Sequence, residues 1–242
     1  MSDEKIVSLS GSPVYQHGEP EAWQPPHGEM CLEQIGAHIA AHLGPVPTVF
    51  HELVSDTVHI DVHQVPPTDD FPFWRLVTSG MSDLPMSVPE GMAVPRHLEL
   101  IATLPGTWKM SQADFQDENW YWPVRLLKSL ARLPHKHSTW LAYGHTVGNA
   151  EPPEPYASNT RLCASILLPP ISAPRAFDTL VIDESKTIEF LAVVPLYPEE
   201  TSYKLDFGLD KLLAQFSRHR IEEVVDIKRV NTCRRKKWFG LF

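Results

Sequence analysis

Three residues with metal-binding side chains alternate along one short segment of the sequence. His59, Asp61 and His63 are separated by Ile60 and Val62. Because successive side chains of a β-strand point to opposite faces, a strand here would present both imidazoles and the carboxylate on one face. Imidazole nitrogens together with a carboxylate oxygen suit zinc or iron. The segment is therefore a candidate metal site, and a metal-dependent enzyme is one function that the sequence allows.

The same alternation has a simpler explanation. The solvated face of an antiparallel strand also carries polar residues at every second position, without any metal. A further ligand, such as His97 or His145, would have to come from another part of the chain. We accordingly predict no metal and no other cofactor, and we keep the His59, Asp61 and His63 enzyme site as the alternative.

Other classes of chemistry lack their sequence patterns. The chain has no G-x-S-x-G nucleophile elbow, no G-x-x-x-x-G-K-[ST] phosphate loop and no G-x-G-x-x-G dinucleotide fingerprint. A net charge of −9 disfavours nucleic acid as a partner, because phosphate backbones attract basic surfaces. Three widely spaced cysteines indicate reduced thiols, and no run of about 18 apolar residues predicts a membrane span. We expect a cytoplasmic protein that is not an enzyme and binds neither nucleic acid nor membrane.

Hydrophobic periodicity and prolines divide the chain into short elements. Apolar residues recur every three or four positions, as in helices, over residues 32–43, 114–133 and 208–216. Pro123 lies inside the second helix, so its regular part should begin near that residue, where a missing N–H costs nothing. Strands are predicted over residues 48–53, 58–65, 73–78, 97–104, 140–147, 162–168 and 188–197. The sum is an α+β fold, a mostly antiparallel β-sheet covered by a few α-helices.

The two ends of the chain differ from its middle. Residues 1–28 are polar and contain prolines, which predicts an N-terminal arm. Residues 232–242 contain four consecutive basic residues, which predicts a solvated basic tail. A single domain over residues 29–231 is expected between them, since no linker is long enough to force two domains.

A dense cluster of small and turn-forming residues follows the third predicted strand. Residues 78–83 have the sequence TSGMSD. Gly80 can adopt a positive φ without steric cost, and serine and aspartate favour turns. The cluster predicts a tight turn.

Five motifs, in this order, resemble the suppressor of fused domain family in its bacterial form. They are TSGMSD at 78–83, LEL at 98–100, the helical stretch 122–133, WLAYGHTV at 140–147 and IEFLAVVPLYPEETSY at 188–203. Their shared order makes the resemblance more specific than any one motif, and together they cover about residues 30–230. The resemblance implies a noncatalytic α+β protein-binding domain, like the N-terminal domain of the animal proteins.

The resemblance also implies a kind of partner. The larger animal relatives sequester Gli-type transcription factors by gripping an extended peptide between two domains. This chain is similar only to the first of those domains, so Gli-like binding is not expected. Bacterial relatives are regarded as immunity proteins that neutralise toxins, so the expected partner is another protein, a toxin encoded by a neighbouring gene. An acidic surface would speed the encounter with a basic toxin.

We predict five residues as contributors to binding: Trp74, Ser79, Asp83, Trp140 and His145. The two tryptophans are the residue type that most often dominates binding energy, if they are exposed. The other three belong to the 78–83 and 140–147 motifs that carry the resemblance.

Overall fold

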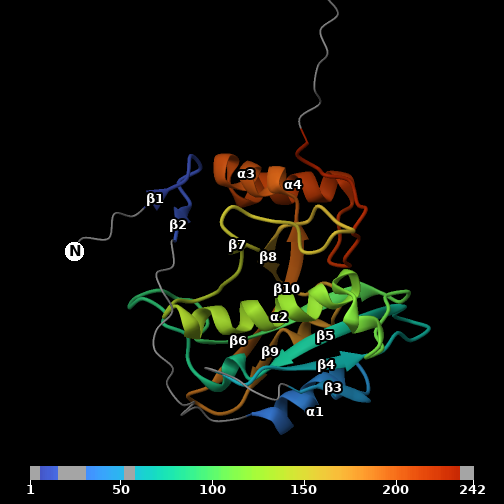
Figure 1. Ribbon diagram of the computed structural model, residues 1–242. Coiled ribbons are helices and arrows are strands. Elements are labelled where there is room, and N and C mark those ends of the chain that lie inside the picture. Colours follow the sequence, from blue (N-terminus) through green and yellow to red (C-terminus); the bar gives the residue numbers. More distant parts are fainter. Residues whose placement is uncertain (1–5, 16–30, 52–57, 235–242) are drawn as a thin grey trace, which may run out of the picture.

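The computed structural model describes residues 6–15, 31–51 and 58–234. One large mixed sheet forms its centre, with strands in the order β3-β4-β5-β6-β10-β8-β7 and with β9 paired to β10 (Figure 1). The eight strands are β3 (Thr48–Phe50), β4 (Asp61–Val65), β5 (Phe73–Ser79), β6 (His97–Pro105), β7 (Thr146–Gly148), β8 (Ala164–Leu168), β9 (Thr179–Val181) and β10 (Thr187–Leu196).

Strand pairing confirms the predicted mostly antiparallel sheet. Among the described strands, six pairs of this sheet are antiparallel, and only β6 and β10 run parallel. The strand predicted over residues 188–197 is β10, which pairs with three neighbouring strands. The segments predicted as strands over residues 48–53 and 58–65 contain β3 and β4, which pair antiparallel, and residues 52–57 lie outside the described residues.

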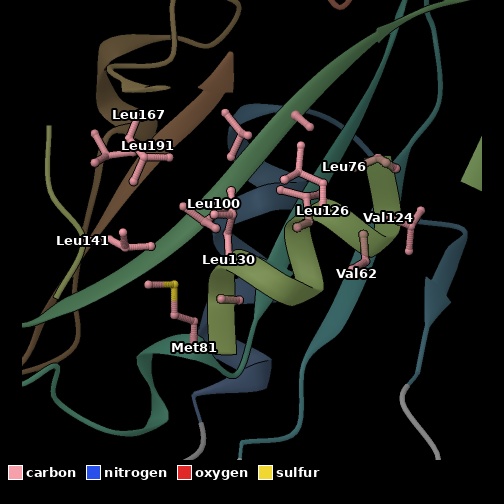
Figure 2. Packing of buried hydrophobic residues seen from close by; sticks show 14 of the residues in the cluster. Val62, Leu76, Met81, Leu100, Val124, Leu126, Leu130, Leu141, Leu167 and Leu191 are labelled. Carbon is pink, nitrogen blue, oxygen red and sulfur yellow. The ribbon is translucent and has the colours of Figure 1, made fainter. Parts of the chain in front are cut away.

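Helices cover both faces of the sheet. They are α1 (Leu32–His42), α2 (Glu118–Lys136), α3 (Pro198–Phe207) and α4 (Leu209–His219), with short 3-10 turns η1 (Met81–Asp83), η2 (Asp114–Gln116) and η3 (Arg175–Phe177). Buried side chains of α2 pack on one face, and Figure 2 shows its Leu126 and Leu130 beside Leu100 of β6 and Leu76 of β5. Across the described ranges, every helix is too short or too polar to cross a bilayer.

The opposite face of the sheet is shared by two helices. Alternate residues of β10 divide between the two faces, as the strand period requires. Phe190 and Ala192 pack with Ile35 and Ile39 of α1, whereas the residues nearer the end of β10 pack with α4. The sheet is therefore buried on both sides, and its polar residues need hydrogen-bond partners inside the protein.

The long helix begins earlier than predicted. It starts at Glu118 rather than near Pro123, because the side chain of Asp117 caps it by accepting a hydrogen bond from Asn119 N at 2.9 Å. Pro123 lies one turn inside, where only its own N–H is lost. The prediction of a helix was correct, but the position of its first residue was wrong.

The segment predicted as a strand over residues 140–147 is mostly a loop. Only its end forms β7, since Gly144 adopts a φ of +78° and His145 N bonds to Ala142 O at 3.0 Å. The turn keeps residues 140–143 out of the strand, whereas Gly144 N and His145 O still bond to Leu167 of β8. The apolar character that suggested a strand arises because Trp140, Leu141 and Ala142 are buried in the main core.

The ends of the chain are described only in part. Within the predicted arm, β1 (Ile6–Val7) and β2 (Pro13–Val14) pair, and Ser10 N bonds to Leu205 O of α3 at 2.9 Å. Residues 235–242 of the predicted tail lie outside the described residues. The division into an arm at 1–28, a domain at 29–231 and a tail at 232–242 stays a prediction.

Candidate functional site

The Asp61 carboxylate lies between two imidazoles. His51 Nδ1 is 2.9 Å from Asp61 Oδ2, and His59 Nε2 is 3.0 Å from Oδ1. Asp61 is buried, whereas both imidazoles are substantially exposed. His63 faces elsewhere, because its Nε2 is 2.8 Å from Ser79 Oγ on the neighbouring strand β5.

These contacts do not form the three-ligand face that the alternative metal site would need. Strand β4 begins only at Asp61, so His59 lies before the ladder, although its imidazole contacts Asp61. His63 is buried, and desolvation lowers the pKa of its imidazole. Within the described ranges, no group of three or more His, Cys, Asp or Glu residues is arranged to hold a metal. The geometry therefore gives the alternative enzyme site no support.

The 78–83 motif forms a tight turn around a buried glutamate. Gly80 adopts a φ of +104°, and Asp83 N bonds back to Gly80 O at 3.2 Å. Glu99 of β6 is fully buried and accepts three hydrogen bonds from the motif. Ser82 N donates at 2.9 Å, Ser82 Oγ at 2.6 Å and Thr78 Oγ1 at 2.6 Å. The carboxylate thus fixes both ends of the turn.

Two half-buried histidines hold the same turn from outside. His97 Nδ1 donates to Ser82 O at 2.9 Å, and His135 Nε2 of α2 donates to Met81 O at 2.8 Å. Desolvation lowers the pKa of both imidazoles. Side chains from β6 and from α2 therefore both hold the turn, which makes it a rigid connection between the sheet and helix α2.

Glu99 is the part of this arrangement that the sequence pattern did not single out. Desolvation raises its pKa from 4.5 to about 7, against the hydrogen bonds from Ser82 and Thr78. Asp83 lies nearby, and burial raises its pKa to about 6 while Lys186 opposes the shift. The available signal was an acidic residue between Leu98 and Leu100 in an otherwise apolar strand, since buried carboxylates are rare without partners.

This burial predicts a pH dependence of stability. A carboxyl whose pKa is raised in the folded state stabilises the fold fully below its unfolded pKa, here 4.5. That contribution is lost as the pH rises through about 7, and it amounts to about 3 kcal/mol. Histidines with lowered pKa values instead make the folded state more stable as the pH rises. The measured quantity is therefore the difference in stability between wild type and Glu99→Gln at each pH. Urea unfolding at acidic and alkaline pH should show that Glu99→Gln removes this fall from the wild-type profile.

One result would contradict the predicted effect of Glu99 on stability. If the free energies of unfolding of wild type and Glu99→Gln change by the same amount between pH 4.5 and about 7, then folding does not raise the pKa of Glu99. Glu184→Gln is the matched control, because Glu184 is an exposed residue whose substitution should leave the profile unchanged.

Three of the five predicted binding residues are buried, and two are partly exposed to solvent. Ser79 is fully buried, Asp83 is 8% exposed, and Trp140 is also 8% exposed with the ring of Tyr15 packed edge-on at 5.0 Å. Trp74 and His145 are partly exposed. Direct contact with a partner requires exposure, so a role for Ser79 and Asp83 would be to position the surface rather than to touch the partner.

Solved structures of similar fold define the class of protein. A suppressor of fused homologue from Neisseria gonorrhoeae aligns over 84% of this chain and 97% of its own, with a TM-score of 0.61 and 16% identity. A chain of the Sufu–Fu complex aligns over 86% and 93%, with a TM-score of 0.57 and 16% identity. Drosophila Suppressor of Fused aligns over 87% of this chain and 52% of its own, with a TM-score of 0.54 and 15% identity. The fold is that of suppressor of fused proteins.

The sequence identifies the family as well. The model of the suppressor of fused protein (SUFU) family matches residues 56–230, and the chain therefore belongs to this family. The match includes the Thr78–Asp83 turn, Glu99 and the whole of α2. Comparison with curated protein sequences gave no match.

Proposed function

We propose that this chain is a noncatalytic cytoplasmic domain that binds another protein stoichiometrically, and that its partner is a toxin which it neutralises as an immunity protein. The observation that carries the proposal is family membership, because a chain with the same fold is present in the Sufu–Fu complex. The 78–83 turn supports the noncatalytic part of the proposal, since the hydroxyls of Thr78 and Ser82 are used in hydrogen bonds to Glu99 that hold the fold.

A contact surface is available where strands β8 and β10 meet helix α4. Tyr143 and Ile171 are 51% and 72% exposed, and both line an apolar groove of about 370 Å³. Exposed apolar patches with a polar rim commonly mark protein interaction sites. His145 lies two residues from Tyr143, next to the start of β7, and we propose that this surface includes it.

The charge of the protein favours a basic partner. The chain carries a net charge of −9, and exposed Glu222 lies on the rim of the same groove. Complementary charge accelerates encounter and excludes wrong partners more than it adds affinity. A basic toxin fits both the charge and the apolar groove.

The contact surface can be tested with matched substitutions of exposed apolar residues. We expect Ile171→Asp to weaken binding of the toxin from the neighbouring gene by about 10-fold or more, because a charge would be buried against an apolar contact. Val181→Asp is the control, since Val181 is 68% exposed and belongs to β9. Titration calorimetry with both variants measures the difference. Equal affinities for the two variants would remove this groove from the interface.

A further inference from the structure

Helix α3 carries a buried lysine side chain without a partner. Lys204 is only 9% exposed, and its ammonium group makes no hydrogen bond or ion pair with a described residue. Lysine is almost never buried to this extent unless it is paired with an acid. Burial of an unpaired charge is unfavourable, so the position of Lys204 calls for an explanation.

Part of this ammonium group remains open to solvent. Among the described residues, the buried polar atoms with neither a partner nor contact with solvent include the ring nitrogens of Trp122 and Trp140, but not Nζ of Lys204. Since Nζ also lacks a described partner, it must be in contact with solvent. A ligand can therefore reach it without a change in the fold.

The neighbour of Lys204 is a second nitrogen group rather than a carboxylate. Desolvation first, and then the charge of Lys204, lower the pKa of the His145 imidazole, so the two side chains lie close together. The imidazole also donates a hydrogen bond to the backbone carbonyl of Trp140. Burial lowers the pKa of Lys204, and no described carboxylate opposes that shift. Two nitrogen groups thus lie together without an acid, in a protein whose net charge is −9.

The N-terminal hairpin of β1 and β2 borders this pair. Figure 1 shows the hairpin beside α3, where Ser10 Oγ donates a hydrogen bond to the backbone oxygen of Lys204 at 3.3 Å. The ring of Tyr15 packs edge-on against Trp140, whose own ring lies 6.0 Å from that of His145. Because Tyr15 is 45% exposed, accessible aromatic surface lies near the two nitrogen groups.

We propose that Lys204, with His145 beside it, binds a carboxylate group of a ligand. The carboxylate would accept a charge-assisted hydrogen bond from the ammonium group, and a second one from the imidazole when it is protonated. A phosphate is less suitable, because proteins bind its higher charge with arginine forks or with several donors. The carbon atoms of the ligand would lie toward Tyr15. The carboxylate belongs either to a free organic acid or to an acidic side chain of another protein.

This site goes beyond the function proposed above, because it needs a carboxylate and no toxin. Lys204 is also absent from the lining of the groove that contains Ile171. A test with small carboxylates can therefore fail while the immunity function holds, and it can succeed while that function fails.

The test is an NMR titration of the ¹⁵N-labelled full chain with two carboxylates, each replacing chloride at constant ionic strength. Acetate represents a free acid, and N-acetylglutamate methylamide represents an acidic side chain of a protein. We expect saturable shifts of the amide signals of His145 and Lys204. The uncharged N-acetylglutamine methylamide should produce none. Whichever carboxylate binds more tightly identifies the source of the ligand.

Two lysine variants connect the shifts to Lys204. Lys204→Met removes the charge and keeps an unbranched apolar chain, so the fold should be retained. It should weaken binding by at least about 10-fold, the effect of losing one hydrogen bond to a charged group. Lys211→Met is the matched control, since Lys211 is exposed on α4, and it should leave the affinity unchanged. Circular dichroism checks that both variants are folded.

Two results would overturn the proposal. One is the absence of a saturable shift with either carboxylate. The other is an equal affinity of wild type and Lys204→Met for the carboxylate that binds.

Discussion

Replacing Gly80 with alanine is expected to lower the free energy of unfolding by more than about 4 kcal/mol, or to prevent folding. Gly80 has a φ of +104°, which alone costs a residue with a Cβ atom about 1–2 kcal/mol. The added Cβ would also lie 1.9 Å from the carbonyl oxygen of His59, a backbone atom that no side-chain rotation can move. The turn would have to open, and the hydrogen bonds of Thr78 and Ser82 to Glu99 would be lost with it.

Alanine substitutions at two other glycines separate the cost of a positive φ from the cost of the clash with the backbone. Gly91 has a φ of +81°, but a Cβ atom added there would meet no described atom within 4 Å, so Gly91→Ala should cost only the conformational penalty of about 1–2 kcal/mol. Gly36 lies in helix α1 with open space around it, so Gly36→Ala should be neutral or stabilising by up to about 1 kcal/mol. Urea unfolding of the three variants measures these differences. A Gly80→Ala protein as stable as Gly91→Ala would show that the turn is not rigid.

The second large effect concerns the segment that follows α4. Arg229 lies over the fully buried carboxylate of Glu200, with its Nη1 2.7 Å from Oε1 and its Nη2 2.5 Å from Oε2. Nη2 also donates to Pro195 O at 2.8 Å, at the end of β10. Arg229→Met is expected to lower the free energy of unfolding by about 3–5 kcal/mol, because it leaves a buried charge without its partner. Chemical denaturation near neutral pH measures the loss.

A double substitution distinguishes a lost attraction from an uncompensated charge. Replacing Arg229 with methionine and Glu200 with leucine removes both charges, so much of the lost stability should return. The recovery should be incomplete, since Glu200 also accepts hydrogen bonds from Tyr197 N and Thr232 N. If the double variant is less stable than Arg229→Met, the buried charge is not the cause of the loss.

Local patterns in the sequence predicted much of the fold. Helix α1 follows from the spacing of Leu32, Ile35 and Ile39, and β10 follows from one continuous apolar run. The prediction of a strand over residues 140–147 was mostly wrong, because a loop that neighbouring elements bury has the same apolar composition as a strand. The parallel pairing of β6 with β10 depends on contacts between residues about ninety positions apart, which no local pattern encodes.

The candidate site was less predictable for a related reason. Alternation indicated that Asp61 and His63 share a strand, but the partners of each side chain come from outside it: His51 for Asp61 and Ser79 for His63. The role of Glu99 depends on a turn seventeen to twenty-one residues earlier in the chain. The unpaired ammonium group of Lys204 becomes informative only when the fold shows that this residue is buried without a carboxylate beside it.

Under the proposed function, this domain acts by binding another protein in a fixed ratio. The most direct test is to titrate the toxin from the neighbouring gene with the purified domain while measuring toxin activity, and to measure growth when both are co-expressed. The proposed function predicts that inhibition is complete at an equal molar ratio and that growth is protected. Full toxin activity at a molar excess of the domain, without growth protection, would contradict it.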